Sequence, residues 1–160
     1  MANTYTQYYL HFVFSPKYRE ALIHKSWKEN LEKYITHVVQ NHEHKLLAIY
    51  AMPDHIHILI GYDANQKIPD LIQIIKNSSN IWIKENKFSK FKFDWQLGYG
   101  GFSHSKAELN KVINYIRNQE SHHKKKSFKE EYLEILKRTE IDYKDEYLFD
   151  FFENINLEII

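Results

Sequence analysis

The sequence feature that most limits the fold is a pair of β-rich segments separated by only two residues. The first covers Lys45–Met52, the second covers His55–Ile60, and Pro53-Asp54 stands between them. A Pro-Asp dipeptide between two apolar runs is typical of a tight turn. Gly61 ends the second run. The two segments therefore predict a β-hairpin, and with it an antiparallel sheet.

Segments on both sides of the hairpin predict how this sheet is covered. Aromatic and apolar residues alternate in Thr6–Phe14, as in a strand, and the run stops at Ser15-Pro16. Helical spacing of apolar residues is found in Leu22–Asn41, residues 67–86, residues 105–123 and Phe128–Lys137, while the glycine-containing Phe93–Ser103 indicates a loop or bent strand. The order β-α-β-β-α-β-α predicts an α+β fold, a ferredoxin-like or RRM-like antiparallel sheet with helices packed on one face.

Length and composition restrict the chemistry. The 160 residues are enough for one domain, and they include no cysteine, which excludes disulfides, thiolate metal sites and cysteine nucleophiles. Apolar runs are far shorter than the roughly 20 residues that cross a bilayer, and the N-terminus lacks the pattern of a secretory signal. We therefore expect a soluble, cytoplasmic protein without a membrane partner, in which His, carboxylate or amide groups must bind any metal ion.

The net charge of +1 conceals an uneven distribution along the chain. Residues 1–63 have a charge balance of zero, residues 64–126 have a balance of +7, and residues 127–160 have a balance of −6. A basic central segment is suited to a polyanion such as nucleic acid, although a solvated lysine-rich surface has the same composition.

His55-Ile56-His57 is the pattern most suggestive of chemistry. On a strand, residues i and i+2 point to the same face, so both imidazoles should lie side by side while Ile56 points to the other face. Such a pair provides half of a divalent-metal site. Two histidines at this spacing also occur for structural reasons, and the triplet by itself leaves both interpretations open.

Tyr115 and Gln119 form a second candidate pair, four residues apart on one face of the helix expected over residues 105–123. They could simply border its apolar stripe. In a functional interpretation, the amide oxygen of Gln119 joins the two imidazoles as a third ligand and Tyr115 places a phenolic oxygen beside the metal. An oxygen ligand with two imidazoles suits Mg²⁺ or Mn²⁺ acting on a phosphate.

Four separate motifs together resemble one known family. They are KYR at Lys17–Arg19, MPDHIHILI around the two histidines, WQLGYGGFS at Trp95–Ser103, and VINYIRNQESHHKKKSF at Val112–Phe128. In order and spacing they resemble the single-tyrosine HUH transposases of small bacterial insertion sequences, which act on single-stranded DNA. The resemblance extends from about Tyr9 to Phe149.

This resemblance implies roles for individual residues. His55, His57 and Gln119 would bind Mg²⁺ or Mn²⁺, and Tyr115 would attack the DNA to form a 5′-phosphotyrosine. Residues 1–126 would form the catalytic domain, and residues 127–160 would add a C-terminal helix and acidic tail to the same domain. The family further implies a homodimer, in which the tyrosine helix of the partner completes each site, and DNA hairpins at the element ends as partners.

Other residues are weaker candidates. Contacts with DNA are expected from Lys17, Arg19, Trp95, His122, His123 and Lys124, although a packing role for Trp95 and a solvated helix end for His122–Lys124 are equally compatible with the sequence. The sequence suggests no role for His11, His24, His37, His42, His44 or His104. Two alternative functions stay open: a non-catalytic nucleic-acid-binding module, and a domesticated relative acting on chromosomal repeat hairpins.

Overall fold

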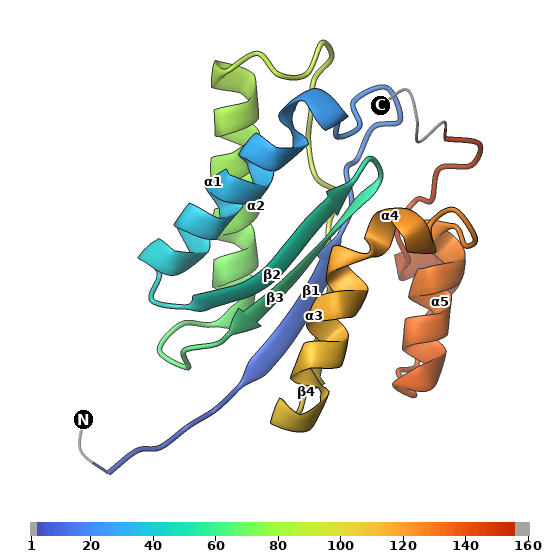
Figure 1. The fold of residues 1–160 in the computed structure, drawn as a ribbon. Helices are drawn as coiled ribbons and strands as arrows, with labels where there is room; N and C mark the ends of the chain where they lie inside the picture. The colour runs from blue at the N-terminus through green and yellow to red at the C-terminus, as the bar shows by residue number, and fades with distance from the viewer. Residues whose placement is uncertain (1–2, 156–160) are drawn as a thin grey trace.

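A four-stranded antiparallel sheet organises the protein in its computed structural model, which describes residues 3–155 (Figure 1). The strands lie in the order β2-β3-β1-β4. They are β1 (Tyr9–Phe14), β2 (Lys45–Met52), β3 (His55–Gly61) and β4 (Gly100–His104); the α-helices are α1 (Lys25–Asn41), α2 (Ile68–Glu85), α3 (Leu109–Arg117), α4 (Gln119–His122) and α5 (Phe128–Arg138). This βαββαβ order, followed by three more helices, confirms the predicted ferredoxin-like α+β class.

The first face of the sheet carries the larger part of the core. Phe12 of β1 lies opposite Ile58 of β3, and both are buried against helices α1 and α2. Leu31 on α1 and Leu71 on α2 are fully buried in the same cluster. Alternate residues of each strand point to this face, as the period of two requires.

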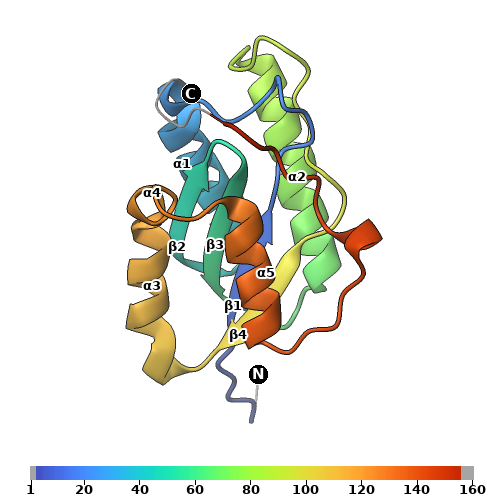
Figure 2. The same cartoon turned by 90° about the vertical axis from the view of Figure 1, so that its right-hand side faces the viewer.

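The second face is also covered by helices, so the expectation of helices on one face alone is wrong in this detail. Figures 1 and 2 show α1 and α2 on one side of the sheet and α3, α4 and α5 on the other. Leu59 of β3 and Ala48 of β2 pack against Leu109 and Ile116 of α3. Since β3 is buried from His55 to Ile60, its second face needs cover as much as its first.

The helix expected over residues 105–123 is divided into shorter pieces. It begins with a capping box of Ser105 and Glu108, which opens a short 3₁₀ turn, and α3 follows. At Asn118 the backbone leaves the helical region (φ −100°, ψ 23°), and α4 starts at the next residue. The break turns Gln119 into the interior, where it is fully buried.

The last described segment lies along α5 and the loop before β4. Phe149 packs on Phe128 and Tyr132. The Gln96 side chain accepts a hydrogen bond from the Asp150 amide at 2.7 Å and donates one to the Asp150 carbonyl at 2.9 Å. The remainder of the expected acidic tail, residues 156–160, falls outside the described residues, and the division at residue 126 stays a prediction.

None of the helices within residues 3–155 has both the length and the apolar composition that crossing a membrane requires.

Candidate active site

His55 and His57 lie side by side on the second face of the sheet, at the start of β3. Their ring centroids are 5.1 Å apart, and neither side chain is exposed to solvent. The turn before them is fixed because Ser15 Oγ donates a hydrogen bond to the Asp54 carbonyl at 2.8 Å. The Asp54 carboxylate in turn lies 2.8 Å from His55 Nδ1. The local geometry expected from the strand spacing is therefore present.

Helices α3 and α4 bring Tyr115 and Gln119 to the same place. Gln119 Oε1 lies 3.1 Å from His55 Nε2, and the Tyr115 ring stands edge-on to His57 at a centroid distance of 5.9 Å. The two pairs of residues that the sequence singled out, which are 58 positions apart between His57 and Tyr115, thus meet in one cluster.

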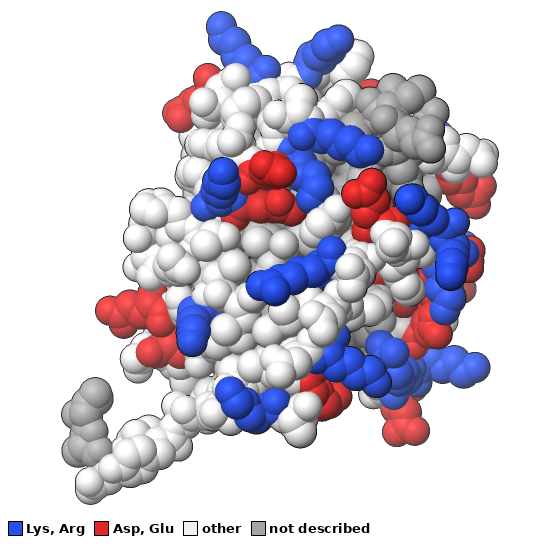
Figure 3. Space-filling view, viewed as in Figure 1, with Lys and Arg blue, Asp and Glu red and all other residues white. Residues whose placement is uncertain are grey.

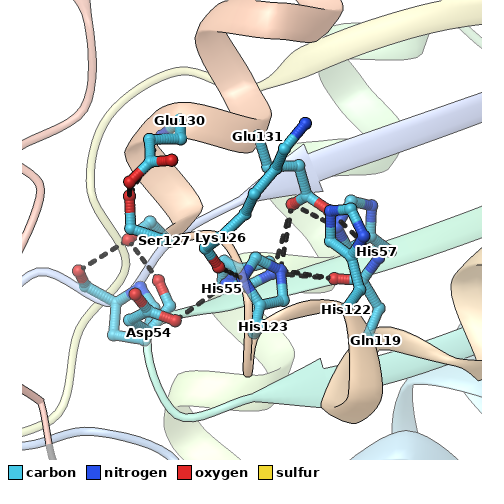
Figure 4. A network of polar contacts seen from close by, with 12 residues as sticks. Asp54, His55, His57, Gln119, His122, His123, Lys126, Ser127, Glu130 and Glu131 are labelled. Atoms are coloured by element: carbon cyan, nitrogen blue, oxygen red, sulfur yellow. Dashed lines mark hydrogen bonds and ion pairs between the residues drawn. The ribbon is translucent and has the colours of Figure 1, made fainter.

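Glu131 on α5 is at the centre of this cluster, although the sequence interpretation gave it no role. Its Oε1 lies 3.0 Å from His57 Nε2, 3.3 Å from His123 Nε2 and 3.5 Å from His55 Nε2. Its Oε2 accepts hydrogen bonds from the Tyr115 hydroxyl and from Gln119 Nε2. Figure 4 shows the Glu131 carboxylate beside His57, His123 and Gln119. The Glu131 carboxylate therefore contacts His55 and His57 on β3, Tyr115 on α3 and Gln119 on α4.

A signal for Glu131 was present in the sequence. Apolar residues at Phe128, Tyr132 and Ile135 define the buried stripe of α5, and Glu131 lies within that stripe with a side chain only 2% exposed. A carboxylate buried at such a position requires partners. The partners themselves could not be identified from the spacing along a single helix.

His123 was expected to contact DNA, but the structure places it inside the cluster. Its Nε2 lies 2.8 Å from Gln119 Oε1, and its Nδ1 lies 2.8 Å from the Lys126 carbonyl. His122 is partly exposed, and its Nε2 is buried without a hydrogen-bond partner in the described part of the chain, 3.5 Å from Glu131 Oε2.

His11 is a further buried histidine that the sequence gave no reason to select. On β1, its Nε2 lies 2.7 Å from Nδ1 of His57, on the side of that ring opposite Glu131. Burial, followed by the neighbouring His57 and His104, holds the pKa of His11 well below its ordinary value. A neutral His11 can donate or accept one hydrogen bond at each ring nitrogen, depending on its tautomer.

The titration behaviour of the cluster follows from burial and from Glu131. Although burial favours the neutral acid, contacts with the imidazoles hold the pKa of Glu131 well below its ordinary value. Burial and the adjacent Glu131 raise the pKa of Tyr115. Burial lowers the pKa of His57. Burial also acts to lower the pKa of His55, but the Asp54 carboxylate, together with Glu131 and Gln119, outweighs it and raises that pKa. The metal-free cluster thus contains an ionised carboxylate and a protonated phenol.

The donor set fits a divalent cation. One ligand atom from each of His55, His57, His123 and Glu131 lies within 4.8 Å of the others, and Gln119 offers an amide oxygen beside them. The unpartnered His122 Nε2 at the same carboxylate indicates that the polar groups here are not fully satisfied by one another. Imidazole and carboxylate ligands bind several divalent metals, so the donor set leaves the ion open.

The other expected DNA-contacting residues lie outside the cluster. Trp95 is 4% exposed, and its indole nitrogen donates to Ser79 Oγ at 2.9 Å, as in the packing alternative. Lys17, Arg19 and Lys124 are exposed. On the face that Figure 3 shows, Lys and Arg are interspersed with Asp and Glu, so the basic residues do not form a separate patch there. The basic central segment and the acidic C-terminal segment are joined by an ion pair between Lys126 and Glu134.

Comparison with known proteins adds to this geometry. Residues 4–119 match the family model described as "Transposase IS200 like". A curated relative, the ISDra2 transposase TnpA of Deinococcus radiodurans, is 25% identical over 69 residues, which cover 43% of this chain and 49% of the relative. The match thus spans about half the length of that relative. The range matched by the family model, residues 4–119, contains His55, His57, Tyr115 and Gln119 but ends before His123 and Glu131.

Two solved structures share the fold. A Deinococcus radiodurans R1 protein assigned to the transposases has a TM-score of 0.59 at 22% identity, covering 74% of this chain and 95% of that one. A REP-associated tyrosine transposase, determined with a REP hairpin bound, has a TM-score of 0.55 at 15% identity, covering 77% of this chain and 74% of the other.

Proposed function

Because the chain belongs to the family of IS200-like transposases, we propose that it cleaves and rejoins single-stranded DNA through a covalent 5′-phosphotyrosine at Tyr115. One observation carries the proposal. The Tyr115 hydroxyl is in contact with a buried carboxylate, and that carboxylate also contacts His55 and His57. A nucleophile beside a proton acceptor and a set of metal-binding groups is the constellation that phosphodiester cleavage requires.

The side chains have distinct tasks in the proposed reaction. Tyr115 Oη attacks the scissile phosphorus, its proton passes to Glu131 Oε2, and the bond from phosphorus to the 3′ oxygen breaks. The 3′ oxygen takes up a proton from solvent and leaves as a free hydroxyl, while the 5′ phosphate stays on the tyrosine. Since the phosphodiester bond is conserved as a phosphotyrosine, attack by another 3′-OH reverses the step and joins new strands.

A divalent cation, Mg²⁺ or Mn²⁺, would be held by His55, His57 and Gln119, with His123 and Glu131 as additional donors. When bound, it would polarise the phosphate and stabilise the negative charge of the transition state. The two oxygens of Glu131 face different partners: Oε1 faces the imidazoles, and Oε2 faces Tyr115. One carboxylate can therefore serve the cation and the phenol together.

We propose single-stranded DNA with hairpins near element ends as the partner. The REP-associated transposase that shares this fold was determined with a hairpin. An enzyme that moves its own element and one that acts on chromosomal repeats would use the same site. Hairpins on both sides of the gene would support the mobile element.

A homodimer is part of the same proposal, but the tyrosine and the histidines already meet within one chain. Tyr115 lies against His57 of its own chain. We therefore expect that a site does not need the partner's tyrosine helix to be complete.

The test is a covalent-adduct assay. Purified protein is incubated with Mg²⁺ or Mn²⁺ and a 3′-labelled single strand taken from the DNA flanking the gene, and label is followed on denaturing gels. We expect a labelled adduct with the wild type and none with Tyr115→Phe. Tyr50→Phe is the matched control, because Tyr50 is also partly buried and hydrogen-bonded to a carboxylate, Glu120. Equal adduct from wild type and Tyr115→Phe would refute Tyr115 as the nucleophile, whereas binding of the strand with no adduct from either protein would favour a non-catalytic binding module.

A further inference from the structure

A cavity of about 370 Å³ opens beside Tyr115, between β4, α3 and α5. The Tyr115 ring forms part of its wall, so the cavity is directly continuous with the proposed reaction centre. Its volume is within the range of about 300 to 1,000 Å³ found for sites that bind small organic groups. None of the residues that hold the cluster together, other than Tyr115 and His11, lines it.

The walls of the cavity combine flat, apolar and hydrogen-bonding surfaces. Phe102, Val112 and Ile135 supply apolar contact, and the imidazole rings of His11 and His104 lie at a centroid distance of 5.6 Å. His104 Nε2 is buried and has no hydrogen-bond partner within residues 3–155. A buried polar atom without a partner at a cavity wall is expected to have one when the cavity is filled.

Two cationic side chains, Lys111 and Arg138, line the cavity and are exposed. Glu108 lines it as well, and its carboxylate accepts hydrogen bonds from the backbone and the hydroxyl of Ser105. No carboxylate of the described residues lies within salt-bridge distance of either cationic side chain, whereas Lys28 and Lys126 elsewhere are paired. Two free cations at the mouth of an apolar pocket suit a ligand with a flat body and an attached phosphate.

We propose that this cavity binds one nucleobase of the DNA strand, from a nucleotide next to the scissile phosphate. The base lies against Phe102 and Val112, one polar atom of its edge pairs with His104 Nε2, and the attached backbone phosphate meets Arg138 and Lys111. The inference rests on the proposed function and deepens it. It assigns the choice of nucleotide at one position beside the cleavage site to residues on β4, α3 and α5.

The experiment measures binding without cleavage. Wild-type protein in EDTA is titrated into labelled single strands, each lacking the base at one position around the cleavage site, and affinity is read by fluorescence anisotropy. Stacking of one base contributes about 1 to 3 kcal/mol in single-strand binders, which corresponds to about 5- to 150-fold in affinity. We expect one position whose abasic form loses affinity by about tenfold, while the others change little.

Two variants connect that position to the cavity. Val112→Phe fills the cavity from α3 and should bind the intact and the abasic strand equally. Arg138→Gln removes a rim cation and should weaken binding of both strands, whereas Lys137→Gln, the same charge change on the neighbouring exposed residue outside the cavity, should not. Circular dichroism establishes that each variant is folded.

Either of two results overturns the inference: no single position is sensitive in the wild type, or the sensitivity persists in full in folded Val112→Phe. If Val112→Phe does not fold, His104→Phe is the second test. This variant should abolish any preference among the four bases at the sensitive position. An unchanged preference refutes the assignment. Adduct formation is scored separately. An adduct without a sensitive position refutes the cavity alone, and a sensitive position without an adduct refutes the chemistry alone.

Discussion

His11→Phe should weaken metal binding although it replaces none of the proposed metal ligands. In the metal-free protein Glu131 is ionised and can only accept hydrogen bonds, so the proton of His57 resides on Nε2, 3.0 Å from Glu131 Oε1. His57 Nδ1 then accepts from His11 Nε2 at 2.7 Å. A cation on His57 Nε2 needs the lone pair there, which moves the proton to Nδ1 and makes His11 the acceptor. Imidazole can exchange these roles, and a phenyl ring cannot.

The size of the effect follows from the burial of both rings. His11 is 4% exposed and His57 is fully buried, so without His11 the Nδ1–H of the metal-bound form has no partner. An unsatisfied buried donor costs about 1 to 3 kcal/mol, and loss of groups that orient a ligand weakens metal binding by about 10- to 100-fold. The metal-free protein also loses a bond, which cancels part of this difference. We therefore expect the dissociation constant to rise by about tenfold.

Isothermal titration calorimetry with Mn²⁺ at pH 7.5 measures this directly. His11→Gln should retain most of the affinity, since an amide can turn to donate or accept. His44→Phe is the matched control, because His44 is equally buried and hydrogen-bonded, to Gln66, but lies outside the cluster. A folded His11→Phe protein with wild-type Mn²⁺ affinity would refute the reasoning.

Three other outcomes follow from the same cluster. Glu131→Gln should slow adduct formation by about 100-fold or more, since a positioned proton acceptor contributes about 10² to 10⁴ in rate; Glu134→Gln, exposed on the same helix, is the control for adduct kinetics. A mixture of His57→Ala and Tyr115→Phe proteins should form no adduct, since both groups come from one chain; recovered adduct on the gel would mean that chains exchange their tyrosine helices. In EDTA, stability should fall as pH drops from 7 to 5, because the folded-state pKa values of His11 and His57 lie below 6.5 and the unfolded chain binds more protons there. Each of these two histidines contributes up to about 1.4 kcal/mol per pH unit to the slope of unfolding free energy against pH. His55 acts in the opposite direction because its pKa is raised. Urea unfolding of wild type and His11→Phe at several pH values should therefore show a shallower slope for the variant.

Local periodicity predicted those parts of the site that depend on a single element. The strand Lys45–Met52 has the predicted bounds, and the spacing within β3 was enough to place His55 and His57 on one face. The spacing of four residues likewise brought Tyr115 and Gln119 together, even though the helix breaks at Asn118. No proline or glycine lies near this break, so the sequence predicted one continuous helix.

Contacts between distant elements were beyond this kind of inference. His11 and His57 are 46 residues apart, and His57 and Glu131 are 74 apart. Their meeting depends on β1 pairing with β3 and on α5 lying over the second face of the sheet. The expectation of helices on one face left α5 without a position, and Glu131 was consequently counted only as part of an acidic segment.

The position of Glu131 gives α5 a part in the chemistry as well as in the fold. The family match ends at residue 119, yet the carboxylate that contacts the Tyr115 hydroxyl and the imidazole of His123 both lie beyond it. Gly100 on β4 allows α5 to come this close, since an added Cβ would lie 2.8 Å from the Tyr132 hydroxyl. A side chain at residue 100 would therefore collide with the Tyr132 ring, which stands one position after Glu131 on α5. The cluster of polar side chains around Tyr115 accordingly extends into α5, so the proposed reaction would depend on the C-terminal helix as well as on the residues before it.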